Sequence, residues 1–572
     1  MTQQLWSAAT DAQNRQQYLQ AATLYRKIVD RRPDFVEAEV NLGLMMQLAG
    51  NLQEATAIFE RVLRKHPDLF APNLLAGLNY LKLDDPDRAL PFLQNAVKLQ
   101  PDKVEARLGL ANDQLQLRQY PEALEQFNRA TELDPNNAEA WTGLGATYLS
   151  VQKNLESDLK QIPSPYRTIL LAESYQEQGK TQKAIDALSS VVASAPDIPC
   201  VHTILGFAYL HESKFSEAAR QFTLDWSPQS GGCLLAELGA VSMNAKLGKT
   251  EDALNALQEA AAIDSAFAQS NAGLYFNDLS AAGVASEARQ ILSAGAQKNF
   301  STKSDQDPIA TMKQGRYSAC SAALAHRPKL DSRELRLLSL CSYFSGNDEN
   351  VLSATDSLLK RSSNDPEPLY WRIQSVERLG ITALTRATEI NPNSASLHTL
   401  MGNLLYEKGD LSEAAAEYRK AIDLKPTFLD AHLALARDLS ADHKSEEAEQ
   451  EIRTVLNANP SDPEANYLMG ELLVNRSEYD GALPYLLNAQ HASADELPYV
   501  HADLSKVYEE RGQVDQAIAE LKLATPVDMD GSYHYRLGHL YMRVGDRTSA
   551  AEALRIAEKL LHQTDVNSQY QK

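Results

Sequence analysis

Four cysteines are the side chains of this chain best suited to covalent chemistry. They stand at positions 200, 233, 320 and 341, and no two of them are spaced as Cys-x-x-Cys. Zinc sites and thioredoxin-like redox sites commonly use that spacing, so neither is predicted. An even number of cysteines that fall into neighbouring pairs would suit two disulfides. The alternative is that each cysteine is a small apolar side chain in a buried slot.

The other motifs that could carry a reaction are incomplete. Residues 247–253, LGKTEDA, contain Gly-Lys-Thr, but a phosphate-binding loop needs an earlier glycine and Met243 stands there. The sequence has no His-Glu-x-x-His pair and no Gly-x-Ser-x-Gly elbow. We therefore predict a protein that is not an enzyme and that carries no cofactor or metal.

Length, composition and charge exclude further classes. The chain has 572 residues, 44% of them hydrophobic, which is enough to build a core. Its formal net charge of -21 repels phosphate backbones, so nucleic acid is not an expected partner. No apolar run approaches the roughly 18–20 residues of a membrane helix. The first residues, MTQQLWSAATDAQ, lack the basic and apolar regions of a signal peptide, so none is predicted there.

A regular repeat organises the helices that position these side chains. Prolines that end apolar-periodic segments recur at a constant step: Pro33, Pro67, Pro101 and Pro135, then Pro392, Pro426 and Pro460. Small residues follow the same step: Gly43, Gly77, Ala111 and Gly145, then Gly402, Ala436 and Gly470. A second small residue lies 12 positions after most of these, and a bulky one 4 positions later. This pattern predicts two amphipathic helices per period, in close contact at the small residues.

The period resembles the tetratricopeptide repeat, in which an aromatic residue, Leu-Gly, Tyr, Ala, an aromatic residue, Ala and Pro recur. The residues that carry the resemblance best are Trp141, Leu144, Gly145 and Tyr148 in 138–148, and Gly402, Ala414, Tyr418, Ala421 and Pro426 in 395–426. About 17 copies cover almost the whole chain. The resemblance implies an all-α solenoid of helix-turn-helix repeats, wound into a right-handed superhelix whose first helices line a concave surface. Because each repeat would pack only on its neighbours, no separate domains are required.

Some repeats depart from the pattern. We expect an N-terminal superhelix over 1–302, with an irregular repeat at 138–164 that lacks the anchors of its second helix. Repeats are irregular or shortened over 303–394, where the turn between Trp371 and Pro392 is missing and two helices could merge or kink at Gly380. This stretch could be a hinge, and harmless drift is the alternative. Regular repeats follow over 395–564, and 565–572 form a polar tail.

The resemblance places certain side chains on the inner surface. In the first four repeats these positions are apolar: Trp6, Val40, Leu44, Leu74, Leu78 and Leu108. Near the middle they are Tyr166 and Glu173, and near the C-terminus Tyr467, Glu471, Tyr499, Lys506, Tyr535 and His539. An exposed apolar stripe would mark a partner site, and aromatic residues beside polar ones suit peptide recognition. The alternatives are a stripe buried by the curvature and ordinary solvated helix faces.

The cysteines can now be placed on the repeats. Cys320 falls on a second helix and Cys341 on the next first helix, which should pack together. Cys200 and Cys233 fall near the starts of consecutive first helices. If these pairs are bonded, the protein is periplasmic or secreted, and otherwise it is cytoplasmic.

The last helix carries apolar residues with little chain after them. Leu554, Ile556, Leu560 and Leu561 precede only a short polar tail. Repeat arrays usually need polar caps, so an uncapped end could join the first repeat of another copy, head to tail, into a ring or filament. A self-covered or frayed end is the alternative.

Two functions remain open from the sequence. The first is a non-enzymatic scaffold that binds peptides or partner proteins in its concave groove. The second is a structural protein that assembles with itself through its terminal repeats. Neither function requires the chain to cross a membrane.

Overall fold

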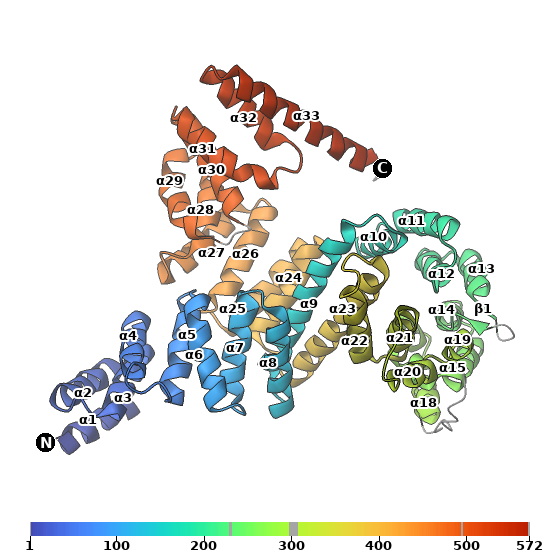
Figure 1. Ribbon diagram of the computed structural model, residues 1–572, viewed down its shortest axis with the longest axis horizontal. Helices are drawn as coiled ribbons and strands as arrows, with labels where there is room; N and C mark the ends of the chain where they lie inside the picture. The colour runs from blue at the N-terminus through green and yellow to red at the C-terminus, as the bar shows by residue number, and fades with distance from the viewer. Residues whose placement is uncertain (1, 228–230, 297–306, 493–495, 570–572) are drawn as a thin grey trace. The chain divides into compact units, whose positions relative to one another are not determined.

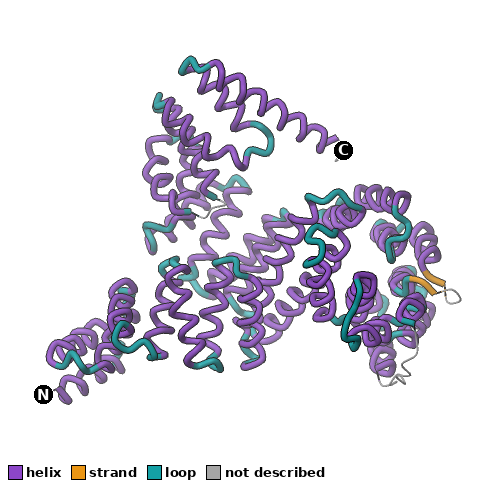
Figure 2. The backbone as a smooth tube through the Cα atoms, in the orientation of Figure 1, coloured by secondary structure: helices purple, strands orange, loops and turns teal. Residues whose placement is uncertain are grey.

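The computed structural model describes residues 2–227, 231–296, 307–492 and 496–569 and is almost entirely helical over them (Figures 1 and 2). The chain forms two compact units, an N-terminal unit of residues 1–390 and a C-terminal unit of residues 391–572. The predicted all-α solenoid of paired helices is confirmed. The described strands are one antiparallel pair, with Trp226 opposite Gly232.

The N-terminal unit consists of these elements: α1 (Thr2–Asn14), α2 (Tyr18–Arg31), α3 (Val36–Leu48), α4 (Leu52–Leu63), α5 (Phe70–Lys82), α6 (Pro86–Leu99), α7 (Val104–Gln116), α8 (Tyr120–Leu133), α9 (Ala138–Lys160), α10 (Pro165–Glu177), α11 (Thr181–Ser194), α12 (Val201–His211), α13 (Phe215–Asp225), β1 (Trp226–Ser227), β2 (Gly231–Gly232), α14 (Leu235–Lys246), α15 (Thr250–Ile263), α16 (Ser265–Ser270), η1 (Ala272–Leu274), α17 (Phe276–Ala281), α18 (Ala285–Ala296), α19 (Pro308–Lys313), α20 (Tyr317–Ala325), α21 (Ser332–Ser345), α22 (Asp348–Leu359) and α23 (Pro366–Ile390).

The C-terminal unit consists of these elements: α24 (Ala395–Lys408), α25 (Leu411–Leu424), α26 (Leu429–Ala441), α27 (Ser445–Ala458), α28 (Pro463–Asn475), α29 (Tyr479–Asn488), η2 (Ala489–His491), α30 (Leu497–Glu510), α31 (Val514–Ala524), η3 (Thr525–Val527), α32 (Ser532–Arg543) and α33 (Arg547–Gln569).

Each ordinary repeat is held by a close approach between its two helices. A Cβ atom added to Gly43 in α3 would lie 2.6 Å from the ring of Phe59 in α4, so a side chain at Gly43 would collide with that ring as it is placed. The turn between them passes through Gly50, whose φ of +85° suits a residue without a side chain. The bulky residue lies 16 positions after the glycine in this repeat, as Tyr418 does after Gly402.

One repeat is split between distant parts of the chain. α9 and α23 are 23 and 25 residues long, and they form a more extensive pair than any other two helices described (Figure 1). A Cβ atom added to Gly145 in α9 would lie 2.6 Å from Leu384 in α23, the role that Phe59 plays for Gly43. The start of α9 and the end of α23 therefore make one hairpin. The expectation that repeats pack only on their sequence neighbours is wrong here, because helices need not be adjacent in sequence to complete a hairpin.

The numbering of the repeats supports this division. If residues 151–373 are left out, Gly402 follows Gly145 at the same step that separates Gly43 from Gly77, and Pro392 follows Pro135 at that step too. Hence residues 151–373 form an insertion in the turn of one repeat, and the regular period resumes after it. The merging of two helices near Gly380 is confirmed: α23 runs unbroken through this residue.

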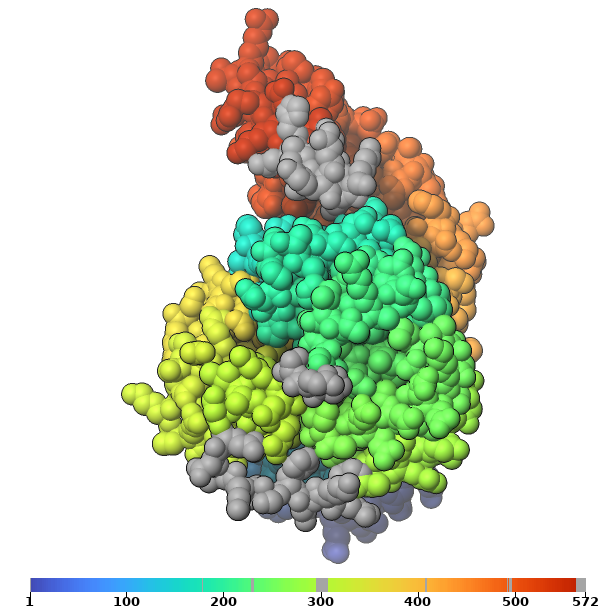
Figure 3. All heavy atoms as spheres, turned by 90° about the vertical axis from the view of Figure 1, so that its right-hand side faces the viewer, coloured from blue at the N-terminus to red at the C-terminus, as the bar shows by residue number. Residues whose placement is uncertain are grey.

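The insertion closes on itself, and we call it the inserted ring. Its helices follow one another from α10 to α22, and both α10 and α21 contact α23 (Figure 1). One buried hydrophobic cluster extends from Leu159 to Ile373, entirely inside the insertion. Val376 and Ala383, further along α23, belong instead to the cluster of α7, α8 and the first part of α9. Figure 3 shows this region with its cyan and green segments beside its yellow ones.

A buried carboxyl group gives the N-terminal unit a specific pH dependence. Asp113 in α7 is fully buried, and neither of its carboxylate oxygens has a hydrogen-bond partner among the described residues. Burial, with a smaller contribution from Asp87, raises the pKa of Asp113 to about 7. The unfolded pKa is about 3.9, so the folded state binds the proton more tightly. The contribution of Asp113 to stability is therefore most favourable below about pH 4 and is lost as the pH rises to about 7.

We expect Asp113→Asn to raise the free energy of unfolding by about 2–4 kcal/mol at pH 8 and to change it little at pH 4. Asparagine fits this site because Asn79 occupies the corresponding position in α5, one repeat earlier. Urea unfolding followed by circular dichroism at pH 4, 6 and 8 measures the effect. Asp30→Asn, an exposed aspartate on α2, is the control. An equal gain at all three pH values would contradict the role of Asp113.

Candidate functional site

A cavity of about 550 Å³ lies within the inserted ring. Its wall comes from the first helices α10, α12, α14, α21 and α23, and from residues 270–278. Apolar and aromatic side chains on the wall include Ile204, Phe207, Leu274, Tyr343, Tyr370 and Trp371. Polar ones include Glu173, Gln176, Lys246, Asp278, Gln374 and Arg378. This volume is in the range of ligand pockets, which occur mostly where several elements converge.

The lysine and the arginine of the wall are already matched by carboxylates. Lys246 Nζ lies 2.9 Å from Asp278 Oδ1. Arg378 Nε donates to Asp348 Oδ2 at 3.0 Å, and its guanidinium lies 4.4 Å from the centre of the Tyr343 ring. These pairs leave neither side chain free to attract an anionic ligand.

Tyr166 and Glu173, predicted on the inner surface, lie where the ring closes. The Tyr370 hydroxyl donates to Glu173 Oε1 at 2.8 Å, and Gln374 Nε2 donates to Glu173 Oε2 at 3.0 Å. The Tyr166 ring lies 5.4 Å from that of Tyr370. The structure thus joins α10 to α23 through residues that stand far apart in the sequence. The α23 partners were missed from the sequence, because the repeat period gives no signal for a contact across an insertion.

The aromatic residues of α21 and α23 form a buried cluster behind the cavity. The Tyr343 and Tyr370 rings lie 5.2 and 5.1 Å from that of Trp371. Burial is the main cause that raises the pKa of both tyrosines above their ordinary range. These hydroxyls therefore stay protonated at neutral pH and act as hydrogen-bond donors.

Two donors on the same wall have no hydrogen-bond partner among the described residues. They are Nε1 of Trp371 and Nε2 of Gln176. Trp371 is only 4% exposed. A buried donor without an acceptor destabilises a protein by about 1–3 kcal/mol.

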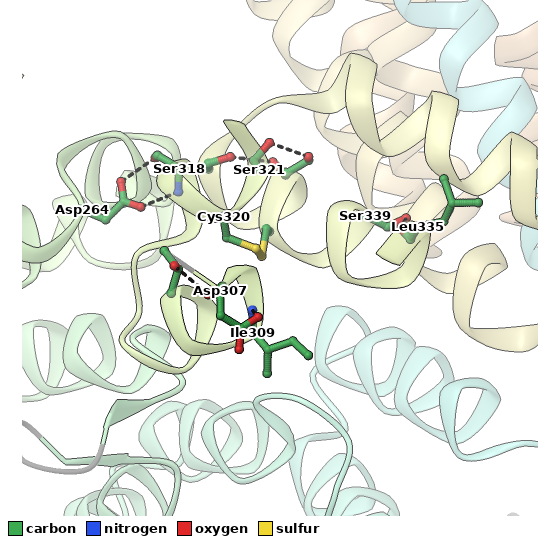
Figure 4. Close-up of a disulfide and its surroundings, with 12 residues drawn as sticks. Asp264, Asp307, Ile309, Ser318, Cys320, Ser321, Leu335 and Ser339 are labelled. Carbon is green, nitrogen blue, oxygen red and sulfur yellow. Dashed lines mark hydrogen bonds between the residues drawn. A yellow bond between two sulfur atoms is a disulfide. The ribbon is translucent and has the colours of Figure 1, made fainter. Parts of the chain in front are cut away.

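Both predicted cysteine pairs are bonded, and both lie in the inserted ring. In the first disulfide, the Sγ atoms of Cys200 and Cys233 are 2.02 Å apart, and these residues lie just before α12 and α14. In the second, the Sγ atoms of Cys320 and Cys341 are 2.10 Å apart, and the bond joins α20 to α21. Next to the second bond, Asp264 accepts hydrogen bonds from the backbone N–H and the hydroxyl of Ser318, at 2.7 and 2.6 Å (Figure 4). Because each disulfide links two neighbouring helices or helix starts of the ring, the disulfides brace its walls. The compartment of the protein stays a prediction.

The apolar stripe predicted in the first repeats lies on α1, α3, α5 and α7. Its side chains Trp6, Val40, Leu44, Leu74 and Leu78 are half-buried, and Leu108 is buried. Trp6 packs on Phe35 and Tyr25, with ring centres 5.1 and 5.4 Å away. Part of the stripe thus belongs to the core between repeats, and its role as a binding surface stays a prediction.

In the C-terminal unit, successive first helices bring together a set of acidic and aromatic residues that we call the acidic face. Its members are Tyr467, Glu471, Tyr499, Asp503, Lys506 and Tyr533. The Tyr467 hydroxyl donates to Glu471 Oε1 at 3.3 Å, and Lys506 Nζ lies 2.8 Å from Asp503 Oδ1. Burial, and then the negative charge of Asp503, raise the pKa of Glu471. Asp503 and Tyr533 were missed, because neither occupies a position that the family pattern turns inward.

Tyr535 lies apart from these contacts, with its ring centre 4.5 Å from that of His539, and is 56% exposed.

The apolar residues predicted to join copies lie on α33. Leu554 packs where a side chain on Gly538 would stand. Ile556 and Leu560 are half-buried, and Leu561 is exposed. Their role in joining copies stays a prediction.

In the described part of the chain, no helix is both long and apolar enough to cross a membrane. Nor does that part hold three or more His, Cys, Asp or Glu side chains placed to bind a metal ion.

Comparison with known proteins agrees with the repeat found by residue spacing. Family models described as tetratricopeptide repeat match residues 7–69 and 433–496, 80–147, and 170–197, and one described as TPR repeat matches 402–437. Cellulose synthase operon protein C of Pseudomonas fluorescens (strain SBW25) is 29% identical over 189 residues, 32% of this chain and 14% of that protein. The match thus spans only a small part of that relative.

Solved structures with similar helices have low overall scores. YrrB, a TPR protein with an unusual peptide-binding site, is 23% identical over 33% of this chain and 97% of its own, with a TM-score of 0.27. MamA from Desulfovibrio magneticus RS-1 is 22% identical over 30% of this chain and 97% of its own, with a TM-score of 0.27. Naa15/Naa10 bound to HypK-THB is 14% identical over 98% of this chain and 94% of that one, with a TM-score of 0.32.

Proposed function

Because the chain is a tetratricopeptide repeat protein, and hence a protein–protein interaction scaffold, we propose that its acidic face binds a basic segment of a partner protein. The observation that carries the proposal is Tyr499, which is 45% exposed on the first helix α30. It stands near Tyr533, and Tyr533 in turn near Asp503. A half-exposed aromatic residue beside partly buried carboxylates suits a ligand with both apolar and cationic groups.

The charge of this region supports a basic partner. Residues 401–500 contain 19 acidic and 8 basic residues. Burial raises the pKa of Glu471, so this carboxylate lies in poorly solvated surroundings. A cation on the ligand would compensate that charge, and complementary charge also speeds association.

Fluorescence anisotropy with labelled ten-residue peptides tests the proposal. A peptide of alternating Lys and Leu should bind, and its affinity should fall as salt rises from 50 to 500 mM, whereas the matching Glu and Leu peptide should not bind. Tyr499→Ala should weaken binding about tenfold, because it removes one aromatic anchor. Leu424→Ala, a side chain of the same 45% exposure on a second helix, is the control. Equal binding of both peptides, or no effect of Tyr499→Ala, would contradict the proposal.

A further inference from the structure

We propose that a groove between two second helices of the N-terminal unit binds a phosphate monoester, carried by a small molecule that also has an apolar group. The groove has a volume of about 720 Å³ and lies between α4 and α6. Its wall comes from these two helices, from the connection after α4 and from Asn73 of α5. It shares no residue with the acidic face or with the cavity of the inserted ring.

Two cationic side chains of the wall have no carboxylate to match them. Arg64 and Lys98 are both exposed, and neither forms an ion pair with any residue that the structure describes. Glu60, on the same wall, is already engaged. Its Oε1 lies 3.1 Å from Arg88 Nη2 and accepts a hydrogen bond from the Tyr80 hydroxyl. The groove therefore presents two positive charges that a doubly charged anion would neutralise.

The framework of the groove occurs a second time in the chain. Asn95 Nδ2 donates to Asn73 Oδ1 at 3.1 Å. The same pair recurs in the C-terminal unit, where Asn488 Nδ2 donates to Asn466 Oδ1 at 3.4 Å. In each pair the asparagine of the first helix also donates to the carbonyl of the proline six positions before it, at 2.8 and 3.0 Å. Both second helices, α6 and α29, contain an internal proline as well.

The two cations do not recur with this framework. At the positions that correspond to Arg64 and Lys98, the C-terminal copy has Asn457 and His491. Because the asparagine pair forms there without them, Arg64 and Lys98 are not needed to build the framework. Like charges on one wall repel each other, and an anion bound between them would replace this repulsion by attraction.

A phosphate monoester suits these groups better than a carboxylate does. It carries about 1.5 to 2 negative charges near neutral pH and has three acceptor oxygens. The Arg64 guanidinium can donate two parallel hydrogen bonds to such a group, and Lys98 supplies the second positive charge. Gln94 is exposed on the same wall, and its side chain has no hydrogen-bond partner among the described residues, so its amide can donate as well.

The rest of the wall suits an apolar or aromatic group on the same ligand. Pro91 is exposed and Phe92 is half-buried. The Phe92 ring stacks on that of Tyr80, with ring centres 5.8 Å apart, so it is held in place on one side. The volume of the groove lies in the range of small-molecule sites.

Titration calorimetry of the full chain tests the groove. The probes are phenyl phosphate, phenyl sulfate, benzoate and inorganic phosphate. We expect phenyl phosphate to bind about fivefold more tightly than the two singly charged probes, the upper range for one exposed ion pair, and more tightly than inorganic phosphate, which lacks the ring. Equal binding of phenyl sulfate or of inorganic phosphate overturns the proposal. Sedimentation with phosphatidylcholine vesicles that contain phosphatidic acid distinguishes a lipid headgroup, and binding to these vesicles in preference to phenyl phosphate also overturns it.

Two matched double variants connect binding to this wall. Arg64→Asn/Lys98→His introduces the residues of the C-terminal copy, so phenyl phosphate should bind about tenfold more weakly while the melting temperature stays unchanged. Lys65→Asn/Lys82→His removes two exposed cations that lie off the wall and should bind normally. Equal binding by the two double variants overturns the proposal. Tyr499→Ala should also bind phenyl phosphate normally, so the groove and the acidic face can fail separately.

Discussion

Removal of residues 151–373 is expected to leave a protein that still folds as an array of helical hairpins. The start of α9 and the end of α23 already pair as one hairpin, with Leu384 against Gly145. Joining residue 150 to residue 374 restores a repeat of the ordinary length. The ring also keeps its own hydrophobic cluster from Leu159 to Ile373, so little of the remaining core is lost with it.

The joined repeat needs a turn that the intact chain does not have. Gly50–Asn51 and Gly409–Asp410 provide this turn in other repeats, at φ of +85° for both glycines. The shortened chain should therefore carry Ser375→Gly and Val376→Asn, at the corresponding positions. We expect a soluble monomer with helical content per residue equal to that of the full chain, measured by circular dichroism and light scattering.

A second shortened chain is the control for register. It lacks residues 151–371, so that two more residues remain in the turn and the following helix is rotated by about 200°. This rotation carries Ala383 and Leu384 off the buried side. We expect aggregation or a melting temperature at least 10 °C lower. Equal stability of the two shortened chains would show that the insertion is not in register with the array.

Reduction of the disulfides is expected to destabilise the N-terminal unit alone. All four cysteines are bonded, and they lie between residues 200 and 341. Bonds that close loops of these lengths, 33 and 21 residues, each stabilise a fold by about 3 kcal/mol, chiefly by restricting the unfolded chain. The C-terminal unit contains no cysteine and thus serves as an internal reference.

Differential scanning calorimetry with and without reductant measures this effect. We expect one thermal transition to shift down by several degrees and another to stay in place. The double variant Cys320→Ser/Cys341→Ser should show part of the shift without reductant and respond less to it. If reductant left every transition unchanged, the disulfides would not support the ring. A shift of both transitions would show that the two units unfold together.

The sequence allowed the helical hairpins to be predicted, because Gly43 and Phe59 mark a local contact that recurs once in every regular repeat. The cysteine pairs also followed from the repeat, since Cys320 and Cys341 stand on helices adjacent in the chain. The ring could not be predicted in this way. Its closure depends on Glu173 and Tyr370, which lie near the two ends of the insertion and are related by no repeat period.

The two candidate sites, the acidic face and the cavity of the inserted ring, could likewise be predicted only in part. Tyr467, Tyr499 and Lys506 were found because the family pattern turns their positions inward. Trp371 and Gln176 were missed, because a missing hydrogen bond becomes visible only when the surrounding atoms are in place. Asp503 was missed because the family pattern does not turn its position inward.

The split hairpin also has a consequence for the order of events during synthesis. Its first helix is complete at Lys160, whereas its second helix ends only at Ile390. At about 5–20 residues per second, synthesis of the chain between these two points lasts roughly 10–45 s. During that time the exposed side of α9 has no partner, while the ring has its own core and can fold first. Folding of the ring thereby brings α23 close to α9 in space, although the two helices are far apart in the sequence.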